Sequence, residues 1–170
     1  MKSDDWEDTK KLINIFGIAS GMSYLHSHGI LHRELCPNLI LEDLNLYPKI
    51  FNFGFSTLKN EKNNEKSDVH SYSMIVYEIM TNEIPFKNID NKVDLYNKVV
   101  KNKSRPIIKE SIPYIYRYFM EICWSDEPEK RPSFDIIVSN LEKNREFITA
   151  EINSKEYFNY VKYVSKNIDK

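Results

Sequence analysis

Residues 32–54, which read HRELCPNLILEDLNLYPKIFNFG, constrain the fold of this chain more than any other stretch. Two short runs within it, Leu39–Leu41 and Lys49–Phe51, have the character of strands, and the segment DLNLYP between them resembles a turn. The stretch therefore predicts a small β-hairpin. Polar residues stand just before its first strand and just after its second.

Most of the remaining chain shows the spacing of apolar residues that is typical of helices. Over residues 9–28, apolar side chains recur at intervals of three and four, which predicts a helix with one buried face, and Gly29 follows as a stop signal. The predicted stripe consists of Leu12, Ile15, Phe16, Ala19, Met22 and Leu25. Val69–Met80 is apolar on most sides, as a central buried helix should be. Further amphipathic helices are expected at Asn91–Lys101, Tyr114–Ile122 and Ser133–Lys143. We therefore expect a mainly α fold with one small hairpin.

Three blocks resemble the C-terminal lobe of a protein kinase, in the family's order and near its spacing. HRELCPNL and NFG are similar to the H-R-D-L-x-x-x-N catalytic loop and the D-F-G magnesium site, with His32, Arg33, Phe53 and Gly54 kept. Residues 67–86, SDVHSYSMIVYEIMTNEIPF, resemble the central helix of that lobe. Residues 123–134, CWSDEPEKRPSF, resemble its C-terminal element, as found in tyrosine kinases and in the tyrosine-kinase-like serine/threonine group.

The resemblance covers roughly residues 5–144 and implies a protein-kinase-like C-terminal lobe, a helical bundle whose hairpin carries the catalytic loop. We accordingly assign residues 1–144 to the lobe and residues 145–170 to a helical tail. We expect the N-terminal lobe to be absent, because nothing before the first helix resembles the glycine-rich loop or its lysine. The residues FSTLKNEKNNEK, between Gly54 and Ser67, are also shorter than a kinase activation segment.

The positions that carry chemistry in the family are altered in this chain. Glu34 stands where the resemblance implies the catalytic aspartate, and its additional methylene moves the carboxylate by roughly an ångström. Cys36 replaces the lysine that neutralises phosphate charge, and a thiol group carries no positive charge. Asn52 occupies the magnesium position, although magnesium favours anionic oxygen ligands. The resemblance therefore implies a pseudokinase with no functional ATP or magnesium site.

The asparagine of the catalytic loop can be aligned in two ways. In the ungapped register Leu39 occupies its position and has no donor atom for a second magnesium ion. If the loop has lost a residue before Asn38 and regained one near Glu42, Asn38 occupies the position instead. The ungapped register is simpler, and neither register restores a carboxylate at Asn52.

Other matched positions are expected to be structural. By resemblance, Asp68 caps the backbone of the catalytic loop from the central helix, and His32 packs in an apolar column. Arg131 pairs in the family with a glutamate that has no counterpart here, so Glu61 or Glu65 is the expected substitute. A buried arginine without such a partner would be destabilising by several kcal/mol.

Further matched residues have one functional and one structural interpretation. Leu41 matches the residue that floors the adenine pocket, and without an upper lobe it is simply apolar surface. Arg33 matches an arginine that binds a phosphorylated activation residue, here Ser56 or Thr57, or else it is an ordinary salt bridge or exposed charge. Trp124 belongs to the framework of the lobe.

Two surfaces are candidates for contacts with a partner protein. His32, Phe53 and Leu41 are predicted to form an exposed apolar patch that a partner covers. In the tail, Asn153 followed by Glu156 resembles a capping box, which predicts a helix. The apolar face of that helix consists of Tyr157, Tyr160, Val161 and Val164. This helix either packs back on its own lobe or docks another protein.

Composition limits the remaining function classes. The chain has 170 residues, 41% of them hydrophobic, and a net charge of −1 without a basic stripe, which argues against binding to nucleic acid. The segment MKSDDWED is unlike a signal peptide, and no apolar run is long enough to span a membrane. Cys36 and Cys123 suit a reducing compartment, so a cytoplasmic location is expected.

Three functions follow from this sequence. The favoured one is a catalytically inactive kinase-like lobe that acts, if at all, through protein–protein contacts. The second is a decayed kinase gene product without activity. The third is a serine/threonine protein kinase that uses ATP when a partner completes the missing lobe.

Overall fold

The computed structural model describes residues 7–59 and 65–167, and it confirms a mainly α fold. The helices are α1 (Asp8–Ser27), α2 (Lys66–Thr81), α3 (Lys92–Tyr96), α4 (Tyr114–Cys123), α5 (Phe134–Lys143) and α6 (Ser154–Asn167). The strands are β1 (Ile30–Leu31), β2 (Ile40–Glu42), β3 (Pro48–Ile50) and β4 (Thr57–Leu58). Short 3-10 turns cover Pro37–Leu39, Pro128–Lys130 and Arg145–Phe147, and a π-helical turn covers Asn97–Lys101.

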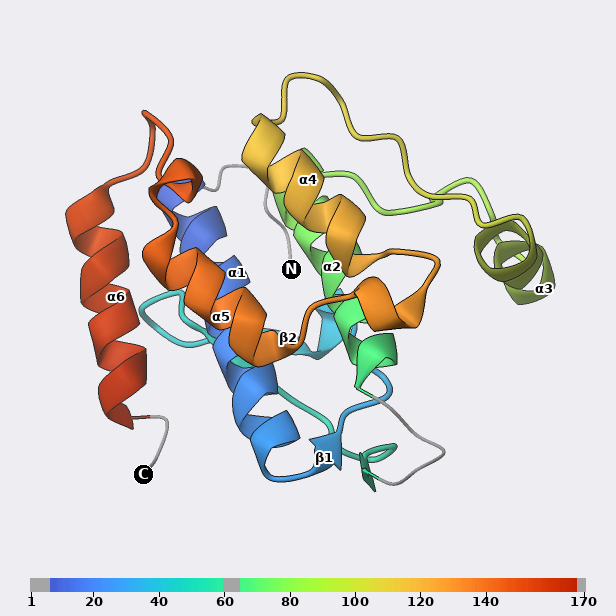
Figure 1. Ribbon diagram of the computed structural model, residues 1–170, viewed down its shortest axis with the longest axis horizontal. Coiled ribbons are helices and arrows are strands. Elements are labelled where there is room, and N and C mark those ends of the chain that lie inside the picture. Colours follow the sequence, from blue (N-terminus) through green and yellow to red (C-terminus); the bar gives the residue numbers. More distant parts are fainter. Residues whose placement is uncertain (1–6, 60–64, 168–170) are drawn as a thin grey trace.

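Helices α1 and α2 form the centre of the molecule; α5, α6 and β3 pack against α1, and α4 packs against α2 (Figure 1). Helix α1 contacts α2, α5, α6 and β3, so it is surrounded on several sides. The prediction of a single buried face is therefore wrong. Ile13 and Ile18 lie outside the predicted stripe and are fully buried, whereas Leu25 within it is only partly buried. Helix α2 is the predicted central helix, with Tyr72 and Val76 fully buried.

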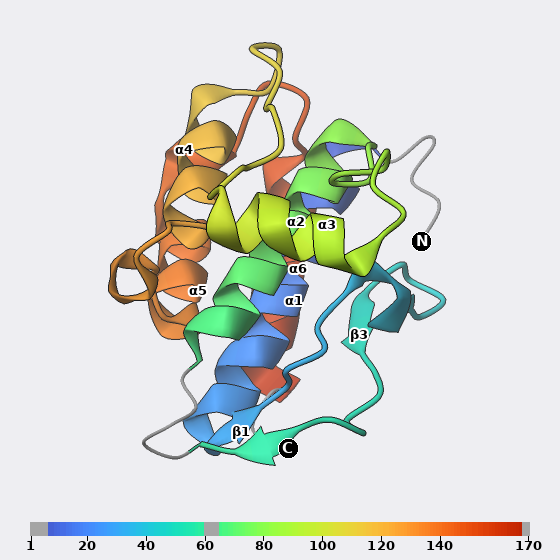
Figure 2. The ribbon, with the colours of Figure 1, turned by 90° about the vertical axis from the view of Figure 1, so that its right-hand side faces the viewer.

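The predicted hairpin is present, displaced by one residue at each strand. Strands β2 and β3 pair antiparallel, with Ile40 opposite Ile50, and they lie beside α1 (Figure 2). The carboxylate of Asp43 accepts the backbone N–H groups of Asn45 and Tyr47, which fixes the turn. A second antiparallel pair, β1 with β4, places Leu31 opposite Thr57 and was not predicted.

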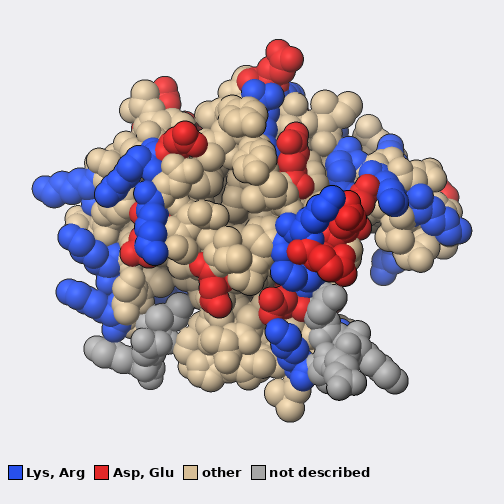
Figure 3. All heavy atoms as spheres, in the orientation of Figure 1, with Lys and Arg blue, Asp and Glu red and all other residues tan. Residues whose placement is uncertain are grey.

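The chain between α2 and α4 leaves the body of the molecule and carries α3 at its outer edge (Figure 1). The predicted helix at Asn91–Lys101 divides there into α3 and the π-helical turn. Neither part contains a fully buried residue. Acidic and basic side chains lie next to each other in this region, while lysine and arginine gather along the edge formed by α6 (Figure 3).

The C-terminal tail packs back onto the lobe. The side chain of Asn153 accepts the backbone N–H of Glu156 at 3.1 Å, so the predicted cap of α6 is confirmed. The ring of Phe16 on α1 makes edge-to-face contacts with Tyr157 and Tyr160, at centroid distances of 5.9 and 6.2 Å. The apolar face of α6 is thus buried against α1, as one of the two alternatives for this helix predicted.

Among the residues that the structure describes, no helix combines the length and the apolarity that crossing a bilayer requires.

Candidate functional site: the loop around residues 32–34 and the segment 51–55

The loop that contains His32, Arg33 and Glu34 is held in place by one carboxylate. Asp68, at the start of α2, accepts the backbone N–H of His32 at 2.9 Å and that of Arg33 at 2.8 Å. Arg33 has a φ of 66°, a left-handed conformation that is unfavourable for a side chain of this kind. Asp68 therefore caps the loop as the resemblance implies, and its two hydrogen bonds compensate for the backbone strain.

His26, which the sequence analysis did not single out, supports this carboxylate from α1. Its Nε2 lies 3.0 Å from Oδ2 of Asp68, and its ring packs edge-to-face on Phe134. Burial alone would raise the pKa of Asp68. The hydrogen bonds from His26, Arg33 and His32 outweigh burial and lower that pKa. No sequence signal identified His26, because its partner lies on another helix.

His32 is a packing residue and not part of an exposed surface. Its side chain is fully buried, its ring lies 5.5 Å from that of Phe53, and its Nε2 lies 3.3 Å from the carbonyl oxygen of Phe51. The prediction that His32 contributes to an exposed apolar patch is therefore wrong. His32 directly follows strand β1, and its side chain packs against the chain segment that follows β3.

The altered catalytic positions lie on and beside the 3-10 turn Pro37–Leu39. Glu34 and Asn38 are exposed, whereas Cys36 and Leu39 are half-buried. The turn forms because Pro37 opens it, and the backbone N–H of Leu39 donates to the carbonyl of Cys36 at 3.0 Å. This loop thus presents the carboxylate of Glu34 and the amide of Asn38 to solvent, beside the exposed side chain of Arg33.

Asn52 has a geometry of its own at the magnesium position. Its backbone is left-handed, with a φ of 61°, which asparagine tolerates better than most residues. Its side-chain oxygen accepts the backbone N–H of Gly54 at 3.1 Å, so its carbonyl group already has a partner. Within residues 7–59 and 65–167, no group of three or more His, Cys, Asp or Glu side chains could hold a metal ion. The residues at this position do not fit a magnesium site.

Exposed apolar side chains lie on strand β2 and on both sides of Asn52 in the sequence. Leu41, which matches the adenine floor, is 49% exposed, and Phe53 is 47% exposed. Phe51 and Phe55 are exposed by 60% and 65%, and the sequence analysis did not include them. Phe51, Phe53 and Phe55 alternate with Asn52 and Gly54 in the sequence, and this pattern could have identified Phe51 and Phe55 as exposed residues. Leu41, Phe51, Phe53 and Phe55 are named here the hairpin patch.

Among residues 7–59 and 65–167, Arg131 finds its partners in backbone carbonyls and not in a glutamate. Its Nε donates to the carbonyl of Ser125 at 2.8 Å, and its Nη1 to that of Lys66 at 2.9 Å. Glu65 pairs instead with Lys59 at 2.8 Å, so its expected pairing with Arg131 is wrong. The other expected substitute, Glu61, lies outside the described residues.

The remaining predicted residues have simple surroundings. Trp124 is buried and packs near Tyr77, at a centroid distance of 6.3 Å. The side chain of Arg33 is exposed, Ser56 donates its hydroxyl to the carbonyl of Phe53, and Thr57 lies in β4.

Comparisons with known proteins agree with the motifs. The family described as protein tyrosine and serine/threonine kinase matches residues 2–65 and 57–141. A probable serine/threonine-protein kinase of Dictyostelium discoideum is 33% identical over 146 residues, which are 73% of this chain and 16% of that protein. Mitogen-activated protein kinase kinase kinase 12 of Rattus norvegicus is 31% identical over 149 residues, which are 74% of this chain and 17% of that protein. The chain therefore spans less than a fifth of the length of these relatives.

Proposed function

The chain belongs to the protein tyrosine and serine/threonine kinase family, and on that premise we propose that it is a catalytically inactive, pseudokinase-like lobe that acts through protein–protein contacts. The observation that carries the proposal is the state of Asn52. A neutral amide occupies the magnesium position, and its oxygen is engaged by the backbone of Gly54. Phosphoryl transfer in this family depends on magnesium to neutralise the charge that develops on the phosphate.

The neighbouring substitutions support inactivity. Glu34 is exposed and longer than aspartate, Cys36 has no fixed charge, and Leu39 has no donor atom. Loss of one such group lowers the rate of transfer by about 10²–10⁴-fold. Effects within one site are not additive, but the loss of the metal position already removes the largest electrostatic contribution.

The hairpin patch supports a role in binding. Four large apolar side chains, each about half exposed or more, lie on strand β2 and on the segment that follows β3. Exposed apolar patches often mark contacts with other proteins. We propose that a cytoplasmic protein covers this patch.

A thermal unfolding experiment tests the inactivity. The purified chain is unfolded with ATP alone and with ATP plus Mg²⁺ or Mn²⁺. A ligand at a hundred times its dissociation constant would add about 2.7 kcal/mol to the free energy of unfolding. We expect a cooperative transition that nucleotide does not move. A metal-dependent shift would instead favour a kinase completed by a partner, and the absence of any cooperative transition would favour a decayed product.

A matched pair of variants tests the binding role. The double variant F53S/F55S removes two exposed aromatics of the hairpin patch, while I107S removes an exposed apolar side chain outside it. In affinity capture from the source cells, a specific partner should be retained by the wild type and by I107S and lost by F53S/F55S. Equal capture by all three proteins would contradict the assignment of the patch.

A further inference from the structure

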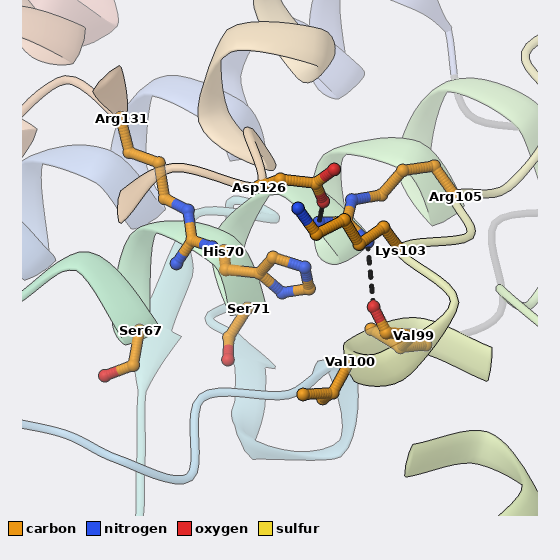
Figure 4. Close-up of a pocket in the computed structure, with 9 residues that line it drawn as sticks. All are labelled: Ser67, His70, Ser71, Val99, Val100, Lys103, Arg105, Asp126 and Arg131. Carbon is orange, nitrogen blue, oxygen red and sulfur yellow. Dashed lines mark hydrogen bonds and ion pairs between the residues drawn. The ribbon is translucent and has the colours of Figure 1, made fainter. Parts of the chain in front are cut away.

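A cavity of about 350 Å³, separate from the loop around residues 32–34 and from the segment 51–55, lies between α2 and the segment that follows α3. His70 and Ser71 of α2 line one wall, Lys103 and Arg105 the opposite wall, and Arg131 lies at the end. Figure 4 shows that Arg131 and Lys103 reach toward His70 from opposite sides. The walls come from parts of the chain that are distant in sequence.

The charges around this cavity do not cancel. Arg105 is neutralised directly, because its Nη2 lies 2.5 Å from Oδ1 of Asp126. Arg131 donates to two backbone carbonyls, which are uncharged, and Asp126 and Glu129 act on it only through space. Within the described residues, no carboxylate forms an ion pair with Lys103 or Arg131. Two cations therefore face the cavity without a paired anion.

The histidine in the cavity experiences this positive field. Burial lowers the pKa of His70 to about 4, assisted by the charges of Arg131 and Arg105, while Asp126 opposes the change. The ring is therefore neutral at physiological pH and can donate or accept one hydrogen bond. The hydroxyl of Ser71 offers a further donor at the same wall.

We propose that this cavity binds one oxyanion with the chemistry of a phosphate monoester. Two unpaired cations complement the two negative charges of such a group, and charge-assisted hydrogen bonds to lysine and arginine are the strongest that phosphate receives. The cavity has the size of a small-molecule site. The proposal concerns a site separate from the catalytic loop and does not depend on whether that loop is active.

The phosphate could be free or carried on a phosphorylated side chain. An adjoining apolar cavity of about 400 Å³ shares His70, Val99 and Val100 with this one. Residues on either side of a phosphorylated side chain could occupy it. Inorganic phosphate and an N-acetylated, amidated phosphoserine therefore serve as the two probes.

Calorimetric titration of the full chain with each probe tests the site. Lys103→Ala removes one cavity cation from an exposed position, so folding should be unaffected. Lys101→Ala makes the same change in charge two residues away and outside the cavity. We expect saturable 1:1 binding that K103A weakens by about tenfold, as loss of one charge-assisted contact should, and that K101A leaves within about twofold. If the blocked phosphoserine binds more tightly than inorganic phosphate, the natural ligand is a phosphorylated side chain of a protein. If the two probes bind equally, the natural ligand is the free phosphate ion.

A spectroscopic measurement locates the anion. A bound dianion offsets the positive field at His70, so saturating phosphate should raise the pKa of that imidazole in an NMR pH titration of the wild type. In K103A the same concentration of phosphate should raise the pKa of His70 by a smaller amount. The proposal is overturned if neither probe binds saturably, if K101A and K103A weaken binding equally, or if saturation leaves the His70 titration unchanged.

Discussion

Oδ1 of Asp68 accepts the backbone N–H of Arg33 at 2.8 Å, although 35 residues separate the two in the chain. The acceptor stands in the first turn of the buried helix α2, and the donor is the residue whose backbone is left-handed. A left-handed residue other than glycine is strained by about 1–2 kcal/mol. The conformation of the loop is therefore imposed by α2 and not by the local sequence.

Replacing Asp68 by asparagine should destabilise the protein. The carboxylate is 1% exposed and accepts hydrogen bonds from two backbone N–H groups besides contacting His26. We expect D68N to lower the free energy of unfolding by about 2–4 kcal/mol in urea titrations, because an amide cannot accept all of these bonds. D90N, the same substitution at an exposed aspartate in the loop after α2, serves as the control, with an expected change within about 0.5 kcal/mol. Equal stabilities of D68N and D90N would contradict the capping role.

The same carboxylate should make stability sensitive to acid. Because the folded state lowers the pKa of Asp68, its contribution is complete above the ordinary aspartate value of about 3.9 and is lost as the pH falls through the lower folded value. The difference in unfolding free energy between wild type and D68N should therefore be constant near neutral pH and narrow below about pH 4. If the difference in unfolding free energy between wild type and D68N stayed constant down to pH 3, folding would not lower the pKa of Asp68.

Gly17 should be intolerant of any side chain. A Cβ atom added at Gly17 would overlap the hydroxyl of Tyr160 and would lie 2.5 Å from Cγ of Pro48, and neither ring can move away easily. At Gly21 the nearest atom, 2.9 Å away, is the tip of the flexible Ile50 side chain. We expect G17A to lower the free energy of unfolding by about 1–3 kcal/mol. In G21A, the gain in helix propensity should offset the small movement of the Ile50 side chain that the added methyl group requires.

Thermal unfolding of the two glycine variants provides the measurement. G17A should melt several degrees below the wild type, and G21A should melt near it. If both variants melted alike, the close approach of α6 and β3 to α1 at Gly17 would not occur in solution.

The tail helix should be an integral part of the core. Tyr157 is fully buried, and its hydroxyl donates to the carbonyl of Leu141 at 2.9 Å. Tyr163, on the same helix, is 45% exposed. Y157A should therefore lower the free energy of unfolding by about 3–5 kcal/mol, while Y163A should change it by less than about 1 kcal/mol. Chemical denaturation checks both variants. A small effect of Y157A would indicate that α6 detaches from the lobe in solution.

Local sequence determined most of the elements of this protein. The intervals between apolar residues located α1, α2, α4 and α5 to within a few residues, because neighbours three or four positions apart share one face of a helix. Asn153 and Glu156 located the start of α6 for a similar reason, since a capping box is a local contact. The kinase motifs placed the loop around Glu34 before the hairpin and the altered residue Asn52 directly after it.

Tertiary structure alone decided what these residues face. It buried His32 and exposed Phe51 and Phe55, and it gave Asp68 a partner in His26. It also gave Arg131 two backbone carbonyls as acceptors and brought Lys103 near it around one cavity. Burial and charge compensation depend on contacts between segments that are far apart in the chain. Periodicity reports only the contacts within one segment, so the sequence could name these residues but not their partners.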